Sequence, residues 1–167
     1  MAASDSAKTC FGALLTSAVF MLQASCVFFP VLGTLFSGAC VVFVAVSAVL
    51  LKRRAVLVYL SVGFLMLAVS PRYALEFLMT TGPAGLTLGL LMDKGSVLSV
   101  LVSGLGMFAG LCGLTYLLGT AAFGSLGAGL SMTAAWPVYA IFSAVYPVVG
   151  LYILKRFIKK QGFMVFF

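Results

Sequence analysis

Histidine does not occur in this 167-residue chain, and acidic side chains number three, Asp5, Glu76 and Asp93. General acid–base and nucleophilic catalysis rely on histidine, on paired carboxylates or on a nucleophile beside a base. The sequence also lacks a glycine-rich phosphate-binding motif. We therefore expect a protein that is not an enzyme and that uses no cofactor and no metal ion.

Charge is also scarce, because charged residues make up 8% of the chain and apolar residues 63%. A soluble domain carries about 25% charged residues, so a soluble globular fold is excluded. The cysteines show no C-x-x-C spacing, which removes the usual basis for a thiolate metal site. We expect them to be buried among apolar side chains; they are Cys10, Cys26, Cys40 and Cys112.

What the chain does have is six apolar runs that approach or reach the roughly 20 residues needed to cross a hydrocarbon core. The runs are apolar on all sides, which favours helices over the alternating strands of a barrel. The sequence therefore predicts an all-α polytopic membrane protein with one integral membrane domain over residues 1–167. The six predicted helices cover residues 11–29, 32–51, 55–70, 73–92, 96–118 and 134–154.

The basic residues fall in alternate gaps between these runs. If the N-terminus lies inside, Arg72 is alone on the outer side, and the cytoplasmic side holds Lys8, Lys52, Arg53, Arg54, Lys94, Lys155, Arg156, Lys159 and Lys160. This positive-inside pattern predicts a cytoplasmic (inner) membrane protein with both termini in the cytoplasm. We therefore expect the net charge of +7 to interact with the lipid bilayer and not with nucleic acid.

Two segments lie outside the predicted helices. Gly119–Thr133 is rich in glycine, alanine and serine, and it is either a flexible loop lying on the protein or an ordinary connector. Residues 155–167 mix cations with aromatic side chains, which is typical of a tail at the anionic inner surface of the membrane.

Arg72 and Glu76 are one helical turn apart at the outer end of the fourth run. One interpretation is a self-contained salt bridge at the membrane interface. The other is the polar corner of an outward-facing substrate pocket, since ionised groups within a membrane pair or line a wet cavity. In the second case the substrate-binding residues are Arg72, Glu76, Gln23, Tyr73, Tyr116, Trp136 and Tyr139. The aromatic members have a simpler explanation too, because Trp and Tyr favour membrane interfaces.

Small residues at i, i+4 spacing mark helix faces that allow close packing within the chain or against a partner. These pairs are Gly85 with Gly89, Gly106 with Gly110, and Ala140 with Ala144. Prolines at three positions in the fourth and sixth runs remove backbone donors and predict bends; they are Pro83, Pro137 and Pro147.

Part of the chain resembles the YybS-like polytopic membrane proteins of bacteria. The matching residues are the turn Lys52-Arg53-Arg54, then Ser70-Pro71-Arg72, and Gly82-Pro83-Ala84-Gly85 leading to Leu88-Gly89. The size and six-helix plan also look like the S components of energy-coupling-factor (ECF) transporters. That resemblance implies an S-component-like bundle that binds a small organic molecule at its outer side. It also implies a membrane coupling subunit and ATPases as partners.

These observations favour a small-molecule-binding membrane subunit that supports uptake, with the ATP-driven step supplied by its partners. The alternative is a structural or scaffolding subunit of a bacterial envelope complex, whose working surfaces would be the small-residue faces and the basic tail. A channel is disfavoured because no helix shows a polar stripe that would line a water column.

Overall fold

The computed structural model describes residues 5–118 and 132–161, and every regular element within these ranges is a helix. The all-α prediction is thereby confirmed. In chain order the elements are α1 (Asp5–Phe28), α2 (Pro30–Leu51), η1 (Lys52–Arg54), α3 (Ala55–Val69), α4 (Pro71–Glu76), η2 (Phe77–Thr81), α5 (Gly82–Leu90), η3 (Met92–Lys94), α6 (Ser96–Leu118) and α7 (Met132–Gln161). The elements α4, η2 and α5 follow one another without a break, so residues 71–90 form one irregular helix.

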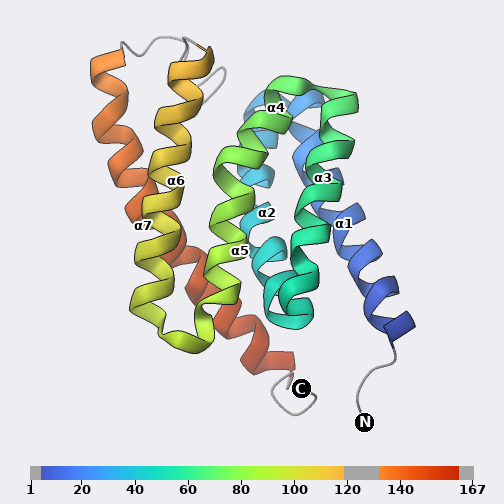
Figure 1. The fold of residues 1–167 in the computed structure, drawn as a ribbon. Helices are drawn as coiled ribbons and strands as arrows, with labels where there is room; N and C mark the ends of the chain where they lie inside the picture. The colour runs from blue at the N-terminus through green and yellow to red at the C-terminus, as the bar shows by residue number, and fades with distance from the viewer. Residues whose placement is uncertain (1–4, 119–131, 162–167) are drawn as a thin grey trace.

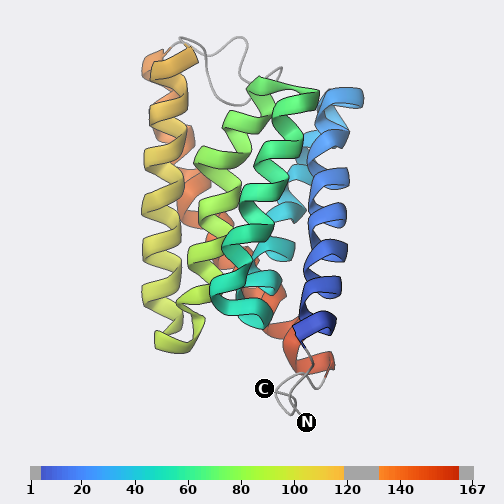
Figure 2. The same cartoon turned by 45° about the vertical axis from the view of Figure 1, so that its right-hand side comes forward.

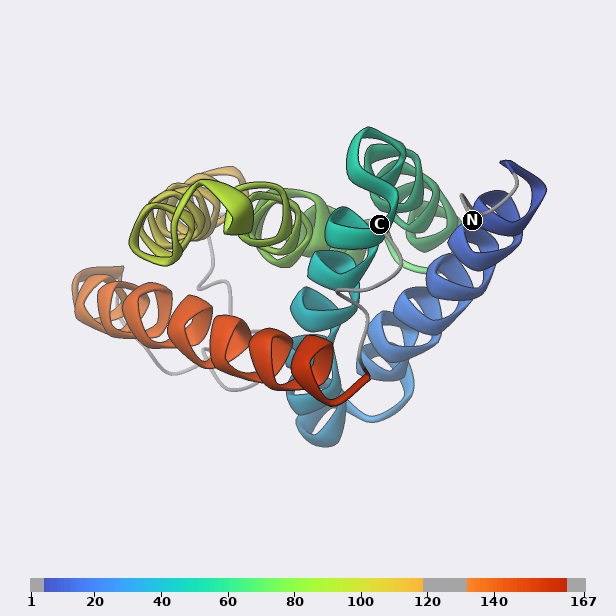
Figure 3. The ribbon, with the colours of Figure 1, turned by 90° about the horizontal axis from the view of Figure 1, so that it is seen from below.

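The helices pack in two rows that are seen end-on in Figure 3. One row holds α6, the α4–α5 helix and α3, and the other holds α7, α2 and α1. Helix α2 lies at the centre, where it contacts α1, α3, α5 and α7. Helix α6 contacts both α5 and α7, which joins the rows at the far edge (Figure 1).

Short sequence signals set the helix ends. Both α2 and α4 begin with a proline at the first helical position, where the missing N–H has no intrahelical partner to lose. Ser70 takes an extended conformation between α3 and α4. Gly95 has φ 140°, a conformation that favours glycine, and it turns the chain from η3 into α6.

Among the described residues, three helices are long and apolar enough to cross a membrane, and they are Asp5–Phe28, Ser96–Leu118 and Ala134–Lys159. Three of the six predicted spans therefore have the length and composition of membrane-spanning helices. Much of the described surface is apolar, including Phe64, Leu105 and Ile141, which are 76%, 68% and 66% exposed. Apolar side chains this exposed on all sides of a bundle suit contact with lipid.

The helix boundaries differ from the predicted ones mainly at the two ends of the chain. Helix α1 begins at Asp5, before its apolar run, and α7 continues through Lys155 and Arg156 to Gln161. The first part of the predicted tail is therefore helical, because Lys and Arg are good helix formers and no proline or glycine precedes Gln161 there. The predicted loop lies outside the described residues from 119 to 131, as does the tail from 162 to 167.

Two hydrophobic clusters form the core. The first joins α1, α2, α3, α4 and α5 around Val19, Val44 and Val62, and the second joins α2, α5, α6 and α7 around Leu88 and Met107. Because α2 and α5 both contribute to both clusters, these two helices hold the two halves of the bundle together.

The cysteines were predicted to be buried, and the structure bears this out for two of them. Cys26 and Cys40 are buried, Cys112 is half-buried, and Cys10 is exposed. The prediction is wrong for Cys10 because it lies in the early turns of α1, where most side chains are exposed.

The basic residues gather at one end of the bundle. The first turns of α1, the turns η1 and η3, and the last turns of α7 all lie at this end (Figures 1 and 2). We call it the basic end, and its cations with described side chains are Lys8, Lys52, Arg53, Arg54, Lys94, Lys155, Arg156 and Lys159. The opposite end, where α4 begins, carries Arg72 and is called the Arg72 end.

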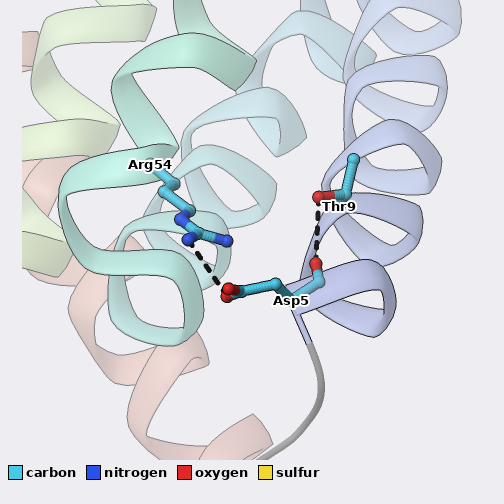
Figure 4. A network of polar contacts seen from close by, with 3 residues as sticks. All are labelled: Asp5, Thr9 and Arg54. Atoms are coloured by element: carbon cyan, nitrogen blue, oxygen red, sulfur yellow. Dashed lines mark hydrogen bonds and ion pairs between the residues drawn. The ribbon is translucent and has the colours of Figure 1, made fainter.

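One exposed ion pair connects α1 to η1 at the basic end. Arg54 Nη2 lies 3.0 Å from Asp5 Oδ1, and Thr9 Oγ1 donates a hydrogen bond of 3.0 Å to the Asp5 carbonyl (Figure 4). The two charged side chains are 50% and 81% exposed, so solvent screens their attraction. The pair therefore orients the start of α1 without contributing much to stability.

Candidate functional site

A polar cluster is buried between α1 and α2 toward the Arg72 end. Gln23 is fully buried, and its Oε1 accepts a hydrogen bond of 2.9 Å from the hydroxyl of Ser37, which is itself 6% exposed. The position of Gln23 is five residues before the end of α1, roughly 8 Å along the helix axis. A polar pair this deep in an apolar bundle joins α1 and α2 at a defined register.

The Gln23 amide is only partly satisfied. Its Nε2 group has no hydrogen-bond partner, and Thr81 Oγ1 is the other buried side-chain polar atom in this condition among the described residues. An amide nitrogen has two N–H donors, and leaving a buried donor unpaired costs about 1–3 kcal/mol. Such groups are few in native proteins, and each one requires an explanation.

Three further side chains complete the cluster. Cys26 lies one turn after Gln23 on the same face of α1, and its thiol donates to the Gly33 carbonyl at 3.0 Å. The Glu76 carboxyl of α4 lies within electrostatic range of both Cys26 and Tyr73. Glu76 and Tyr73 are half-buried. The cluster of Gln23, Cys26, Ser37, Tyr73 and Glu76 therefore spans three helices, and we call it the Gln23 cluster.

Arg72 stands at the edge of this cluster. It is exposed and within electrostatic range of Glu76, yet the two do not form an ion pair within the described part of the chain. The Arg72 and Glu76 side chains therefore do not adopt the self-contained salt bridge that was one of the two interpretations of the sequence. Glu76 is half-buried and Arg72 is exposed.

Glu76 is followed directly by a π-helical segment, η2, which begins at Phe77. Here the N–H of Gly82 donates to the carbonyl of Phe77, five residues earlier, and Pro83 has no N–H to offer the carbonyl of Met79. Pro83 was predicted to bend this helix, and the irregularity found next to it is a π-helical segment. Such segments occur frequently at functional sites.

Two neighbouring helices fit onto the carbonyls of η2. The Tyr59 hydroxyl of α3 donates a hydrogen bond of 2.7 Å to the Leu78 carbonyl. On the other side, Gly110 of α6 lies so close that a Cβ there would be 1.7 Å from the Met79 carbonyl oxygen. The irregular backbone is thereby held by two residues distant in sequence, the Tyr59 side chain and the Gly110 backbone.

The remaining aromatic residues predicted for the pocket lie in the other half of the bundle. Tyr116 on α6 is 86% exposed, and Trp136 on α7 is half exposed and packs against Phe108 with ring centroids 6.2 Å apart. Tyr139 is buried in the second hydrophobic cluster, where its hydroxyl shares a hydrogen bond of 2.7 Å with Thr115. The structure thus brings Gln23, Tyr73 and Glu76 together and places these three aromatic residues apart from them.

The small-residue pairs also separate into two kinds. A Cβ at Gly85 or Gly89 would meet the α2 backbone at 2.8 and 2.4 Å, so these glycines allow α5 to approach α2 closely. A Cβ at Gly106 would meet nothing within 4 Å, although it lies one turn from Gly110. The positions that face outward are Gly106, Ala140 and Ala144.

Ser37 and Cys26 were not among the predicted binding residues. The usable signal was the spacing of Gln23 and Cys26, three residues apart and thus on one face of an otherwise apolar helix. Within the residues that the structure describes, no group of three histidine, cysteine, aspartate or glutamate side chains lies together as a metal site would require.

Comparisons of the chain with protein-family models, with characterised proteins and with solved structures give no match. The resemblance to YybS-like proteins and to S components therefore stays a prediction.

Proposed function

We propose that the chain is a small-molecule-binding membrane subunit that supports uptake, with its binding site at the Gln23 cluster. The observation that carries the proposal is the unpaired Nε2 of a fully buried Gln23. A purely structural position would be filled at lower cost by leucine, since an unpaired buried donor destabilises the fold. A ligand with a hydrogen-bond acceptor would satisfy this donor and explain why the polar side chain is there.

The chemistry of the cluster defines the class of ligand. The Gln23 amide donates, the Glu76 carboxylate accepts or meets a cation, and the Tyr73 ring offers an apolar face. Arg72 at the rim attracts an anionic group on the way in. A small organic molecule with both an acceptor and a positively charged or hydroxyl group fits this set.

The proposal includes a topology of six spans with both termini in the cytoplasm of a bacterial inner membrane. Two features support it. The basic end gathers cations from η1, η3, α1 and α7, which matches the positive-inside rule if this end is cytoplasmic. The exposed apolar side chains of α3, including Leu57 and Phe64, suit lipid contact although α3 has 15 residues and extends about 22 Å.

The Gln23 cluster then lies toward the outer side of the membrane, where a substrate arrives. The chain holds no nucleotide-binding motif, so an ATP-driven step would belong to a membrane coupling subunit and its ATPases. Reporter fusions after Gln161 and within residues 119–131 test the topology, with activity expected on opposite sides of the membrane.

The ligand is tested by purifying the protein from its host in mild detergent and identifying small molecules that co-purify by native mass spectrometry. We expect a polar metabolite on the wild-type protein that is lost in Gln23→Leu and Glu76→Gln. Ser17→Ala is the matched control, because Ser17 is an exposed polar residue on α1 whose hydroxyl bonds to the local Ala13 carbonyl.

The stability of the ligand-free proteins provides the second readout. Gln23→Leu combined with Ser37→Ala removes the unpaired donor without leaving the Ser37 hydroxyl unpaired, so the ligand-free double variant should unfold at a higher temperature than the wild type. The proposal fails if no molecule co-purifies with the wild type, or if Gln23→Leu retains the same molecule as the wild type does.

A scaffolding subunit is the second candidate, and the outward-facing Ala140 and Ala144 on α7 favour it. Small residues that face lipid without an internal partner suit close approach of another transmembrane helix. Under this function Ala140→Leu would release partner proteins in crosslinking experiments, while Gln23→Leu would change stability alone.

A further inference from the structure

A cavity of about 550 Å³ opens at the basic end, away from the Gln23 cluster. Its walls come from the end of α2, the turns η1 and η3 and the last turns of α7, all of which lie at the end of the bundle nearest the viewer in Figure 3. The lining residues are of two kinds, apolar and charged. The apolar ones are Val46, Val49, Leu50, Met92, Phe157 and Ile158.

The charged lining residues are Lys52, Lys155, Lys159 and Asp93. Three ammonium groups against one carboxylate leave the cavity with an excess of positive charge. The cations are exposed, whereas Val46 and Ile158 are 8% and 9% exposed. The cavity therefore combines an apolar interior with a cationic mouth, which is the pattern expected for an amphipathic anion.

One hydrogen bond and one unusual backbone conformation distinguish two of the lysines. Lys155 Nζ donates a hydrogen bond of 2.5 Å to Ser96 Oγ, which leaves two of its three donors for a ligand. Lys52 has φ 51°, and it is the one residue other than glycine with positive φ among those described. That conformation is unfavourable for a residue with a Cβ, and strained residues of this kind concentrate at binding sites.

We propose that this cavity binds an anionic phospholipid of the inner leaflet, with the phosphate between the lysines and an acyl chain along the apolar walls. The volume lies within the range of about 300–1,000 Å³ typical of ligand pockets. A free phosphate ion would use the lysines and leave the apolar walls uncovered. Basic pockets between transmembrane helices on the cytoplasmic side are suited to anionic headgroups.

Asp93 determines which lipid headgroups fit the cavity, through their charge and hydroxyl groups. A carboxylate beside the phosphate site repels a headgroup with further negative charge and accepts hydrogen bonds from hydroxyl groups. A headgroup with one phosphodiester and free hydroxyls, such as that of phosphatidylglycerol, satisfies both the lysines and Asp93.

The test measures the thermal unfolding of the purified chain in detergent micelles while a short-chain lipid is titrated. The three probes are dihexanoyl phosphatidylglycerol, dihexanoyl phosphatidylcholine and inorganic phosphate. We expect phosphatidylglycerol to raise the unfolding temperature in a saturable manner, with little effect of the other two. Saturation by inorganic phosphate at equal concentration would overturn the assignment to a lipid.

The decisive comparison is between two double variants that remove the same charge at the same end. Lys52→Gln with Lys159→Gln removes two cations that line the cavity, whereas Lys94→Gln with Arg156→Gln removes two that do not. We expect the first pair to weaken phosphatidylglycerol binding about thirtyfold and the second to change it less than threefold.

Both pairs are exposed, so each variant should unfold at the wild-type temperature without lipid, which shows that it has folded. Equal weakening by both pairs would mean that the lipid responds to the overall charge of this end, and the proposed cavity site would be wrong. No response of the wild type to phosphatidylglycerol would overturn it as well.

Discussion

Gly110 is the position where the structure makes its sharpest prediction about stability. This residue of α6 faces the carbonyl of Met79 in the π segment, and a Cβ added there would lie 1.7 Å from the carbonyl oxygen and 2.7 Å from the carbonyl carbon. Both atoms belong to the backbone, so no side-chain rotation relieves the clash. The substitution Gly110→Ala therefore requires α6 to move away from η2.

The size of the effect follows from the geometry. A relaxed contact between a carbon and a carbonyl oxygen is about 3.3 Å, so the helix would have to shift by about 1.6 Å. A shift of that size separates Met107, Leu111 and Leu114 from the second hydrophobic cluster to which they belong. Overpacking usually costs about 1–3 kcal/mol, and a clash with backbone should cost about 3 kcal/mol or more.

The chain offers a matched control one helical turn away. Gly106 lies on the same helix, and a Cβ there meets nothing within 4 Å. Gly106→Ala changes the same atoms and the same helix propensity without a clash, so its free energy of unfolding should stay level or rise by up to about 1 kcal/mol.

The assay is reversible unfolding by sodium dodecyl sulfate in mixed micelles. Trp136 is the chain's single tryptophan, and its contact with Phe108 makes its fluorescence sensitive to separation of α6 and α7. Circular dichroism follows helix content in parallel. Equal stability of the two alanine variants would refute the packing of Gly110 of α6 against the Met79 carbonyl of the π segment.

The remaining predictions concern the π segment and the thiols. Tyr59→Phe removes the hydrogen bond to the Leu78 carbonyl and should destabilise the protein by about 1 kcal/mol in the same assay. Tyr152→Phe is the control and should have no effect, because the Tyr152 side chain is 64% exposed. Equal losses of stability in the two variants would contradict the role of the Tyr59 hydroxyl. Maleimide should modify Cys10 within minutes in the folded protein and Cys40 only after denaturation, because Cys10 is exposed and Cys40 is buried. Mass spectrometry of the labelled protein measures both, and fast labelling of Cys40 would contradict the packing of α1 on α2.

Part of the Gln23 cluster could be predicted from the sequence and part could not. Gln23, Tyr73 and Glu76 were identifiable because polar residues in apolar runs are conspicuous. Ser37 was not, because a serine in a transmembrane helix commonly bonds to its own backbone. Its pairing with Gln23 arises from how α1 and α2 pack, and nothing in either helix alone specifies that register.

What the sequence by itself determined was the character of the chain. The long apolar runs and scarce charges lead to an all-helical fold, and proline and glycine at helix ends limit where the helices begin and turn. The spacing of cations in alternate gaps likewise indicated that they would share one end. These properties depend on residues near one another in the chain, so they are readable without the fold.

The tertiary structure decided everything that depends on contact between distant segments. It separated Tyr116, Trp136 and Tyr139 from the Gln23 cluster, because α6 and α7 pack at the far edge of the bundle. It brought the end of α2 beside the end of α7 to form the lysine-lined cavity. It also distinguished Gly110 from Gly106, two glycines of one motif, because only the first faces a backbone carbonyl of another helix.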